Sequence, residues 1–224
     1  DRKDFVFPEW SYSKYMKKQL PIGTVKVDRM YNEPTFHYTP IPYFEGDVDL
    51  NGYFQSSKYF EKHIPLILPY ITLKDEYMDY IWGKYKQYLK KPCCSIHVRH
   101  GDYLKSPHLE WHGVLSEAYY EEAIFSLYRK NADDIQFLIF SDDNDWCHSN
   151  FHLRNQLIVD GEEDIIDLFI GSRCNDHIIA NSSFSWWQSY LSNGQGRTIA
   201  PKNWFTEKAG LDTKDLYCKD WIVN

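Results

Sequence analysis

The sequence predicts an α/β fold with a parallel, Rossmann-like sheet in its second half. After residue 92, short runs of β-branched and aromatic residues alternate with amphipathic segments of helical length. This alternation is typical of parallel sheets, because two parallel strands must be joined by a crossover segment. In addition, polar clusters follow four of the predicted strands, and ligands of such sheets bind at the carboxyl ends of the strands.

The composition indicates a chain with a sizeable core and argues against several classes of protein. Hydrophobic residues make up 43% of the 224 positions, enough for one large domain or two smaller lobes. The net charge of −7, without a long basic run, argues against a nucleic-acid partner. No apolar run approaches the ~20 residues of a membrane span, and no signal-peptide pattern is present.

The five cysteines bear on compartment and metal binding. Their number is odd, and no CxxC or HExxH spacing occurs. This pattern predicts reduced core thiols, no structural zinc and a cytoplasmic location. A membrane-peripheral or Golgi-luminal location is the alternative, and it requires an anchor ahead of Asp1.

Residues 1–91 are predicted to form a separate N-terminal lobe, on the acceptor side, and residues 92–224 a second lobe. In the first lobe, prolines interrupt short strands expected at 5–7, 25–27 and 48–54, and residues 31–38 are expected to be a loop. A helix expected over 73–89 is ended by Pro92. Because the chain begins without Met and enters a strand at once, we expect this lobe to be incomplete.

The second lobe is predicted to alternate strictly between strands and helices. Strands are expected at 94–99, 135–140, 156–159, 177–180 and 198–200, and helices at 117–130, 145–151, 164–174 and 184–191. Four polar clusters should then converge at one sheet edge. They are His97, Arg99 and Asp102; Ser141, Asp142 and Asp143; Asp160 and Gly161; and Asn181, Ser182 and Ser183.

The first cluster points to an anionic ligand. His97 and Arg99 alternate with Ile96 and Val98, so both polar side chains should share one face near the end of a strand. An arginine fixed at a sheet edge suits a phosphate. The alternative is a salt-bridged loop that only ties down the edge.

The segment that starts at Asn181 lies at a predicted strand-to-helix transition. The backbone N–H groups of a helix N-terminus, together with the hydroxyls of Ser182 and Ser183, can bind an anion opposite Arg99. The alternative is simple capping of the helix by Asn181 or Ser182, with Phe184 in the core.

Two further segments carry weaker signals for chemistry. Asp143-x-Asp145 has the spacing of an acidic pair that holds a divalent ion, but acidic residues also commonly begin helices. We favour Asp142 as an acceptor for N–H or hydroxyl groups of a ligand, with no metal. In the loop 108–113, His112 or Glu110 is a candidate general base.

With these clusters in place, the sequence resembles the α-1,2-fucosyltransferases of glycosyltransferase family 11. Residues 97–103, His-Val-Arg-His-Gly-Asp-Tyr, are similar to the family motif H-x-R-R-G-D-Y. The other matching segments, in order along the chain, are Gly52–Phe60, Ser141–Asp143 with Trp146-Cys147, Asp164-x-x-Asp167-Leu168, Cys174-x-x-His177-x-Ile179 and Asn181–Trp187.

The resemblance implies a GT-B-like architecture of two Rossmann-like lobes. It also implies an inverting transfer from GDP-β-L-fucose to the 2-hydroxyl of a terminal galactose in an oligosaccharide, without a metal or other cofactor. Arg99 would grip the β-phosphate opposite the helix start at Ser182 and Ser183, while His97 orients the nucleotide or Arg99. Asp102 would fix Arg99 or act as the base, and Phe184 would pack against the nucleotide.

The sequence departs from the family pattern in two places. A glycine-rich segment of the form G-G-L-G-N-Q is missing, and His100 stands where the family has a second arginine. These departures leave two alternatives to a fucosyltransferase. One is a homologue that binds a GDP-sugar or glycan without turnover, and the other is a transferase that uses another GDP-sugar.

Overall fold

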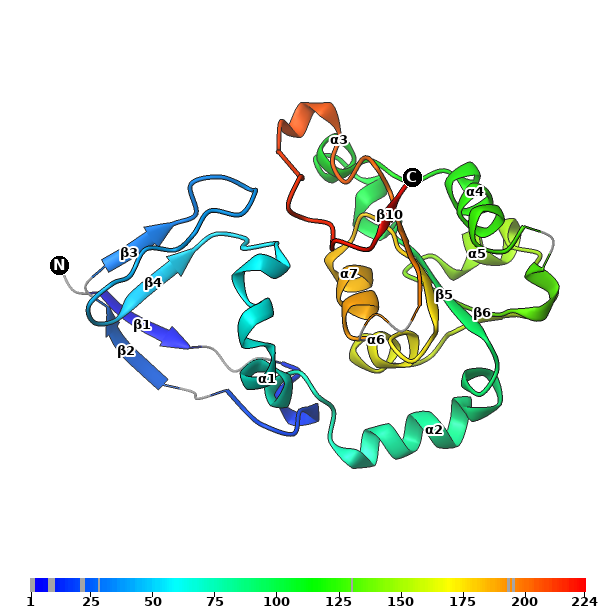
Figure 1. Ribbon diagram of the computed structural model, residues 1–224, viewed down its shortest axis with the longest axis horizontal. Coiled ribbons are helices and arrows are strands. Elements are labelled where there is room, and N and C mark those ends of the chain that lie inside the picture. Colours follow the sequence, from blue (N-terminus) through cyan, green and yellow to red (C-terminus); the bar gives the residue numbers. More distant parts are fainter. Residues whose placement is uncertain are drawn as a thin grey trace. The chain divides into compact units, whose positions relative to one another are not determined.

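Figure 1 shows the computed structural model, which describes residues 3–7, 11–20, 23–27, 29–129, 131–192, 194 and 196–224. The chain divides into two compact units. The first consists of Asp1–Met78 with Leu211–Cys218, and the second of Asp79–Gly210 with Lys219–Asn224. The predicted lobes, 1–91 and 92–224, differ from these units in where the first one ends and in the placement of residues 211–218.

The second unit is built on a six-stranded sheet in which all neighbouring strands are parallel, as predicted. Its strands are β5 (Cys93–Val98), β6 (Gln136–Ser141), β7 (Gln156–Ile158), β8 (Asp176–Ile178), β9 (Thr198–Ala200) and β10 (Ile222–Val223). The spatial order is β10-β9-β8-β5-β6-β7. The chain thus winds outward from β5 in one direction and then in the other, which is the order of a doubly wound sheet.

This order creates a crossover point between the neighbouring strands β5 and β8. In the register of the pair, Ser95 lies beside His177 and Ile96 beside Ile178. Ligands of doubly wound sheets bind outside the carboxyl ends of the strands at such a point. Arg99 follows β5 there, and Asn181 follows β8.

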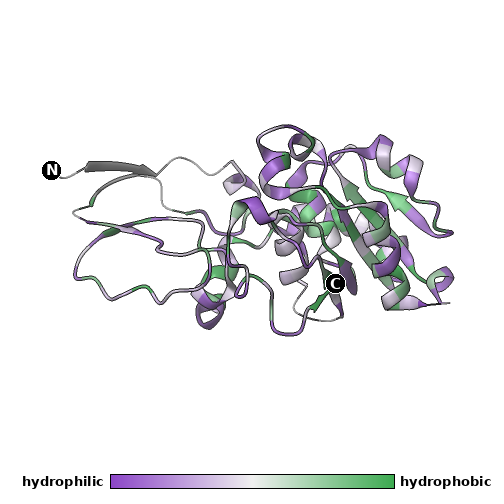
Figure 2. Ribbon diagram, turned by 90° about the horizontal axis from the view of Figure 1, so that it is seen from above, coloured by the Kyte–Doolittle hydropathy of each residue, from purple (hydrophilic) through white to green (hydrophobic). Residues whose placement is uncertain are grey.

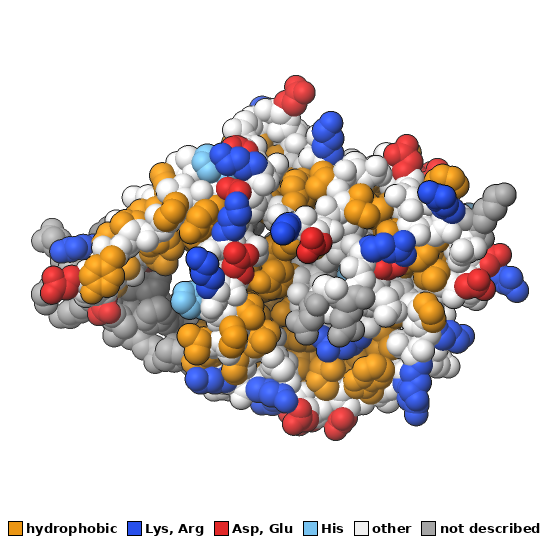
Figure 3. Space-filling view, in the orientation of Figure 1, with side chains coloured by type: hydrophobic (Ala, Val, Ile, Leu, Met, Phe, Trp, Pro, Cys, Tyr) orange, Lys and Arg blue, Asp and Glu red, His pale blue; other side chains and the backbone are white. Residues whose placement is uncertain are grey.

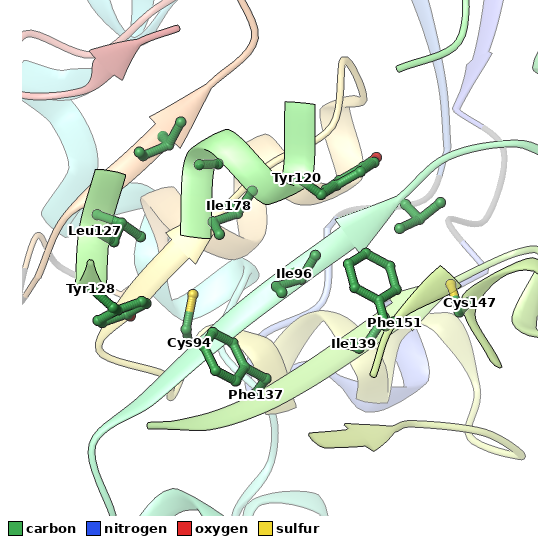
Figure 4. Close-up of a cluster of buried hydrophobic side chains, with 13 residues drawn as sticks. Cys94, Ile96, Tyr120, Leu127, Tyr128, Phe137, Ile139, Cys147, Phe151 and Ile178 are labelled. Carbon is green, nitrogen blue, oxygen red and sulfur yellow. The ribbon is translucent and has the colours of Figure 1, made fainter. Parts of the chain in front are cut away.

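The helices of this unit cover both faces of the sheet. They are α3 (His108–His112), α4 (Glu117–Tyr128), α5 (Asn144–Asn150), α6 (Asp164–Gly171) and α7 (Ser183–Tyr190). One face packs against α4 and α5, and Figure 4 shows the buried cluster formed there by Ile96, Tyr120, Phe137 and their neighbours. The opposite face carries His97, whose ring lies against Phe184 of α7. Because both faces are covered, all six residues of β5 are buried, as expected for a central parallel strand.

The distribution of hydrophobic residues agrees with a buried sheet that is covered by helices on both faces. Figure 2 shows hydrophobic residues along the strands of the sheet and more hydrophilic residues on the surrounding helices and loops. Figure 3 shows acidic and basic side chains interspersed over the face in view. Within the described ranges, no helix has both the length and the apolar character needed to cross a bilayer.

The first unit is built differently. Strand β1 (Lys3–Phe7) pairs antiparallel with β2 (Gly23–Val27), and β3 (Arg29–Asn32) pairs parallel with β4 (Val48–Asn51). The strands described in this unit therefore form two two-stranded sheets. The resemblance implied a Rossmann-like first lobe, expected to be incomplete in this chain, and the parallel pair β3–β4 is the parallel sheet described in it. Helix α1 (Ile64–Ile67) is short, and α2 (Asp75–Leu89) runs from this unit into the second.

The carboxylate of Glu33 organises the segment that precedes α1. It accepts hydrogen bonds from the backbone N–H of Tyr53 at 2.8 Å and of Phe54 at 3.0 Å, and from the hydroxyl of Tyr59 at 3.1 Å. Phe54 has a left-handed backbone with φ of 48°. Ser56 caps the short 3-10 helix Ser57–Tyr59 by accepting the backbone N–H of Lys58.

Most predicted elements of the second unit are observed within a few residues, and 198–200 is exact. The predicted end of one helix at Lys130 lies outside the described residues. The loop expected over residues 31–38 is partly wrong, because Tyr31 and Asn32 belong to β3 and pair with Leu50 and Asn51. Here pairing with a distant strand overrides the local signal of the prolines. Helix α3 and strand β10 were not predicted.

Candidate functional site

Arg99 follows β5 and is held between two carboxylates. Its Nη2 lies 2.5 Å from Oδ1 of Asp102, and its Nη1 lies 2.6 Å from Oδ2 of Asp142, which follows β6. The structure thus joins two of the polar clusters that the sequence singled out. A guanidinium carries five N–H donors, so two such contacts leave donors for a further oxyanion. The Arg99 side chain is 32% exposed and therefore accessible to one.

The close approach of Asp142 depends on a glycine. Oδ1 of Asp142 accepts a hydrogen bond from the backbone N–H of His100 at 2.8 Å. Gly101 has φ of +21°, and a Cβ at this position would overlap the Asp142 carboxylate. Both oxygens of Asp142 are therefore engaged within the protein, and its predicted contact with a ligand remains a prediction.

His100, at the position where the resembled family has arginine, belongs to the packing around the start of α5. Its Nδ1 lies 3.0 Å from Oδ2 of Asp143, and its ring packs edge-on against Trp146 at 4.6 Å between centroids. Asp143 also caps α5 by accepting the N–H of Trp146 at 3.1 Å. The hydrogen bond with His100, followed by this capping bond, lowers the pKa of Asp143 below its usual value.

Asp143 is consequently occupied on both carboxylate oxygens, Oδ1 by the N–H of Trp146 in α5 and Oδ2 by His100. Across the described ranges, no group of three or more His, Cys, Asp or Glu side chains is arranged to hold a metal ion. The expectation of a metal-independent site stays a prediction. In the acidic pair Asp143-x-Asp145, Asp143 has a structural role, because it caps α5.

His97 is buried beside Phe184, with 4.9 Å between the ring centroids. Burial, and next the charge of Arg99, lowers the pKa of His97 to about 3. The imidazole is therefore neutral at physiological pH. Its Nδ1 is buried and has no hydrogen-bond partner among the described residues. A neutral ring next to Arg99 fits the expected orienting role, which stays a prediction.

The start of α7 is not capped by a side chain in the described structure, contrary to the simpler alternative. Ser182 occupies the N-cap position with an extended backbone and makes no capping bond through its hydroxyl, and Ser183 is exposed. Asn181 instead donates from Nδ2 to the backbone oxygens of His112 at 2.8 Å and of Trp204 at 3.2 Å. The N–H groups and hydroxyls at this helix start therefore remain suited to an anion.

His112, a candidate base from the sequence, lies in a stack of rings. Its centroid is 4.4 Å from that of Tyr103, with the two planes only 15° apart, and 5.2 Å from that of Phe205. Burial, and next the nearby His108, lowers the pKa of His112. The other candidate, Glu110, is paired with Lys208, and this pair lowers the pKa of Glu110. Neither assignment as a base is tested by this geometry.

Two residues without a role in the sequence predictions stand out in the structure, Tyr103 beside Arg99 and Asp167 in α6. Tyr103 places its ring 5.2 Å from the guanidinium carbon of Arg99. Asp167, near the start of α6, has a pKa raised to about 7 by burial and then by the charges of Glu162, Asp164 and Asp160. The sequence signals were an aromatic residue four positions after Arg99 and a dense acidic run before Asp167.

The fold and the site together define a class of protein. A doubly wound parallel sheet, with an arginine and a helix start at its crossover point, is typical of α/β domains that bind phosphate-containing ligands at this edge. The model of the family described as glycosyl transferase family 11 matches residues 45–224. The chain belongs to this family.

Its relatives include bacterial and mammalian glycosyltransferases. The O-antigen biosynthesis glycosyltransferase WbnK of Escherichia coli is 32% identical over 77% of this chain and 59% of its own length. The alpha-1,2-colitosyltransferase of Escherichia coli is 31% identical over 80% of this chain and 63% of its own. The galactoside 2-alpha-L-fucosyltransferase SEC1 of Bos taurus is 30% identical over 45% of this chain and 28% of its own.

The chain thus spans about three-fifths of the length of the two bacterial relatives. Among solved structures, a NodZ alpha-1,6-fucosyltransferase soaked with GDP-fucose has a TM-score of 0.45 at 17% identity. The likeness covers 68% of this chain and 54% of that one. It is too distant to place individual residues.

Proposed function

We propose that this chain carries the donor site of a glycosyltransferase that moves L-fucose from GDP-β-L-fucose to the 2-hydroxyl of a terminal galactose in an oligosaccharide. We further propose that the transfer inverts the anomeric carbon and needs no metal or other cofactor. The observation that supports this most directly is Arg99, fixed by Asp102 and Asp142 at the crossover point. Membership of glycosyl transferase family 11 supplies the reaction class.

The reaction requires stabilisation of a departing nucleotide. The bond from the sugar C1 to the phosphate oxygen breaks, its electron pair leaves with GDP, and a bond from the acceptor oxygen to C1 forms. Arg99 and the N–H groups at the start of α7 would stabilise the charge that grows on the β-phosphate. Removal of one such donor typically costs about 3–4 kcal/mol of barrier.

The acceptor hydroxyl must lose its proton as the new bond forms. Asp102 is the nearest carboxylate to Arg99, and its side chain is about half exposed, so it can face both the donor and an incoming hydroxyl. His97 is a neutral hydrogen-bonding partner for the nucleotide in this scheme, and Phe184 provides an apolar surface beside it.

A second donor is favoured by one specific observation. A relative that is 31% identical over 80% of this chain bears the name alpha-1,2-colitosyltransferase. GDP-colitose would present the same diphosphate to Arg99, so the same site would serve. A homologue that binds the nucleotide sugar without turnover is the remaining alternative.

GDP binding tests the donor site directly. Isothermal titration of GDP into the full chain, with EDTA present, is expected to show binding that Arg99→Ala weakens at least tenfold. Arg154→Ala is the matched control, because Arg154 is exposed and only loosely paired, 3.7 Å from Asp133. Equal affinities for wild type and Arg99→Ala would contradict the proposed site.

Release of GDP then separates the proposed activities. We expect release from GDP-fucose when a galactoside such as lactose is added. Faster release from GDP-colitose would favour that sugar, and GDP binding without release from either would favour the non-catalytic homologue. Dependence of release on added Mn²⁺ would contradict a metal-independent transfer.

A further inference from the structure

Three aromatic rings lie in series beside Arg99. We call Tyr103, His112 and Phe205 the ring column. Tyr103 and His112 are stacked nearly parallel at 4.4 Å, and Phe205 contacts His112 at 5.2 Å with the two planes tilted by 41°. The Tyr103 ring lies 5.2 Å from the guanidinium carbon of Arg99, within the range of a cation–π contact.

The ring column is tied to the start of α7 through Asn181. The Tyr103 hydroxyl donates to the backbone oxygen of Asn181 at 3.3 Å, and Nδ2 of Asn181 donates to the backbone oxygen of His112 at 2.8 Å. Asn181 is 1% exposed and directly precedes Ser182, the N-cap residue of α7. One residue therefore contacts both the column beside Arg99 and the helix start across the crossover point.

Helix α3, which supplies His112, is too short to be stable by itself. It is held by the segment after β9. The N–H of Thr206 donates to the oxygen of Trp111 at 2.9 Å, and the Thr206 hydroxyl donates to the oxygen of Glu110 at 2.5 Å. These bonds, with the ion pair of Lys208 and Glu110, fix the His112 ring within the column.

We propose that Tyr103 and His112 are positioning residues, and that the ring column and Asn181 set the guanidinium of Arg99 at a fixed place opposite the start of α7. This inference rests on the proposed binding of a nucleoside diphosphate by those two groups. An arginine side chain has about 2 kcal/mol of rotamer entropy. Holding it in place before the ligand arrives lowers the cost of ordering it on binding.

The proposal assigns His112 a role different from general base. A ring spacer needs the flat shape of the imidazole, whereas a base needs its titratable nitrogen. The titratable or charged groups that act on His112 are His108, Asp102 and Arg99. A phenylalanine at this position keeps the stack and removes the titration, so the two roles predict opposite results for His112→Phe.

The test measures GDP affinity by isothermal titration with the full chain of six variants. They are Tyr103→Phe, Tyr103→Leu, His112→Phe, His112→Ala, Arg99→Ala and the control Tyr43→Leu, whose side chain is exposed in the first unit. We expect Tyr103→Leu and His112→Ala to weaken binding about 3- to 30-fold, the range of a cation–π contact. Tyr103→Phe and His112→Phe should stay within threefold of wild type, because each keeps its ring. The shorter bond of Asn181 to the His112 backbone, at 2.8 Å, remains when the 3.3 Å bond of the Tyr103 hydroxyl is lost.

A double variant and a pH profile make the test specific. In the Arg99→Ala background, Tyr103→Leu should weaken binding less than twofold, because the group that it positions is gone. His112→Phe should keep the pH profile of GDP release between pH 5.5 and 8.5. Loss of release in His112→Phe with unchanged GDP affinity would instead identify His112 as the base and overturn the proposal.

Failure of the proposal is distinguishable from failure of the proposed function. If wild type does not bind GDP, the donor site itself is wrong, and the positioning role falls with it. If wild type binds GDP, Arg99→Ala does not, and Tyr103→Leu binds like wild type, only the positioning role is wrong. Circular dichroism and thermal unfolding of each variant establish that a lost affinity is not a lost fold.

Discussion

The same three residue types meet at both ends of the parallel sheet, with different consequences. At the carboxyl edge, Arg99 contacts Asp102, Asp142 and the ring of Tyr103. At the opposite end, Arg197 contacts Asp176 through Nη2 at 2.6 Å and Nε at 3.3 Å and lies over the ring of Tyr128 at 5.3 Å. Both clusters therefore combine an arginine, a carboxylate and a tyrosine ring.

The two clusters differ in how completely their donors are used. All three guanidinium nitrogens of Arg197 are bonded within the protein, since Nη1 also donates to the oxygen of Leu127 at 2.9 Å. The Tyr128 hydroxyl and the Arg197 N–H, both at 2.7 Å, complete the shell around Asp176. At the amino end, every guanidinium nitrogen is used within the protein, so this cluster stabilises the fold. At the carboxyl edge, Arg99 keeps N–H donors, so this cluster can accept a ligand.

The largest effect is expected from Arg99→Lys. This variant keeps the charge but loses the planar fork that contacts two carboxylates and, in the proposed site, would also contact a phosphate. We expect GDP release from the sugar nucleotide to fall about 100-fold, comparable to the loss of one donor to a transition-state charge. The free energy of unfolding should change by less than about 0.5 kcal/mol. A large loss of stability with normal GDP release would show that Arg99 stabilises the fold, as Arg197 does, and does not serve the reaction.

Arg197→Ala is the mirror experiment. Among the described residues, it leaves the largely buried carboxylate of Asp176 with the Tyr128 hydroxyl and the Arg197 backbone N–H as partners. We expect the free energy of unfolding to fall by about 2–3 kcal/mol. GDP affinity, measured well below the lowered melting temperature, should match wild type. A selective loss of GDP affinity would show that the amino end also serves the ligand.

The pKa values of two aspartates, Asp176 and Asp167, shift in opposite directions. Burial raises the pKa of Asp176, but its bonds with Arg197 and Tyr128 outweigh burial and leave that pKa below its usual value. Asp167, on the carboxyl side, has a pKa raised to about 7. The folded state therefore binds the Asp167 proton more tightly than the unfolded state. Its contribution to stability is full below about pH 4 and is lost as the pH rises through about 7.

Asp167→Asn should accordingly stabilise the protein in a pH-dependent way. At pH 8 we expect a gain of about 2–4 kcal/mol in the free energy of unfolding, from 1.36 kcal/mol per pKa unit. The gain should vanish near pH 4. Urea unfolding of wild type and Asp167→Asn at both pH values measures the difference. A gain of the same size at both would rule out titration of Asp167 as its cause.

The smallest effect is expected on GDP affinity in Asp102→Asn. The variant keeps a hydrogen-bonding oxygen for Arg99 and removes one negative charge beside the proposed phosphate site. Since Asp102 is about half exposed, the Coulombic change is about 1 kcal/mol, and GDP affinity should rise about two- to tenfold at low salt. If affinity falls instead, the charge of Asp102 is needed to hold Arg99. If affinity rises while release stops, Asp102 is the base.

The sequence was sufficient to predict five of the six strands of the parallel sheet, all but β10, and the edge where the polar residues gather. Buried parallel strands such as Cys93–Val98 are nearly continuous apolar runs, so their ends and the polar residues that follow are visible in the order of residues. Arg99, Asp142 and Asn181 could therefore be assigned to one edge. The pair of Arg99 with Asp102 was also predictable, because the two residues are only three positions apart in the sequence.

The rest depends on contacts between distant segments. The placement of β8 beside β5, rather than beside β7, joins segments far apart in the chain and has no local signal in the sequence. The second carboxylate on Arg99 comes from Asp142, which follows β6, and the ring column joins residues from three separate segments. The prediction of a loop at Tyr31 and Asn32 was wrong for the same reason, because these two residues pair with β4, 19 residues further along the chain.

The proposed nucleotide site can form only when β5 pairs with β8, because Arg99 follows the first strand and Asn181 follows the second. Ser95 and His177 are 82 residues apart in the chain, yet they meet at 2.7 Å in neighbouring strands. Closing so long a loop is slow and costs entropy before the pairing returns any stability. The two halves of the proposed nucleotide site therefore lie together only in chains in which β5 and β8 have paired. A bound nucleotide would select those chains and draw the folding equilibrium towards them by mass action, so that substrate supply and folding yield become linked.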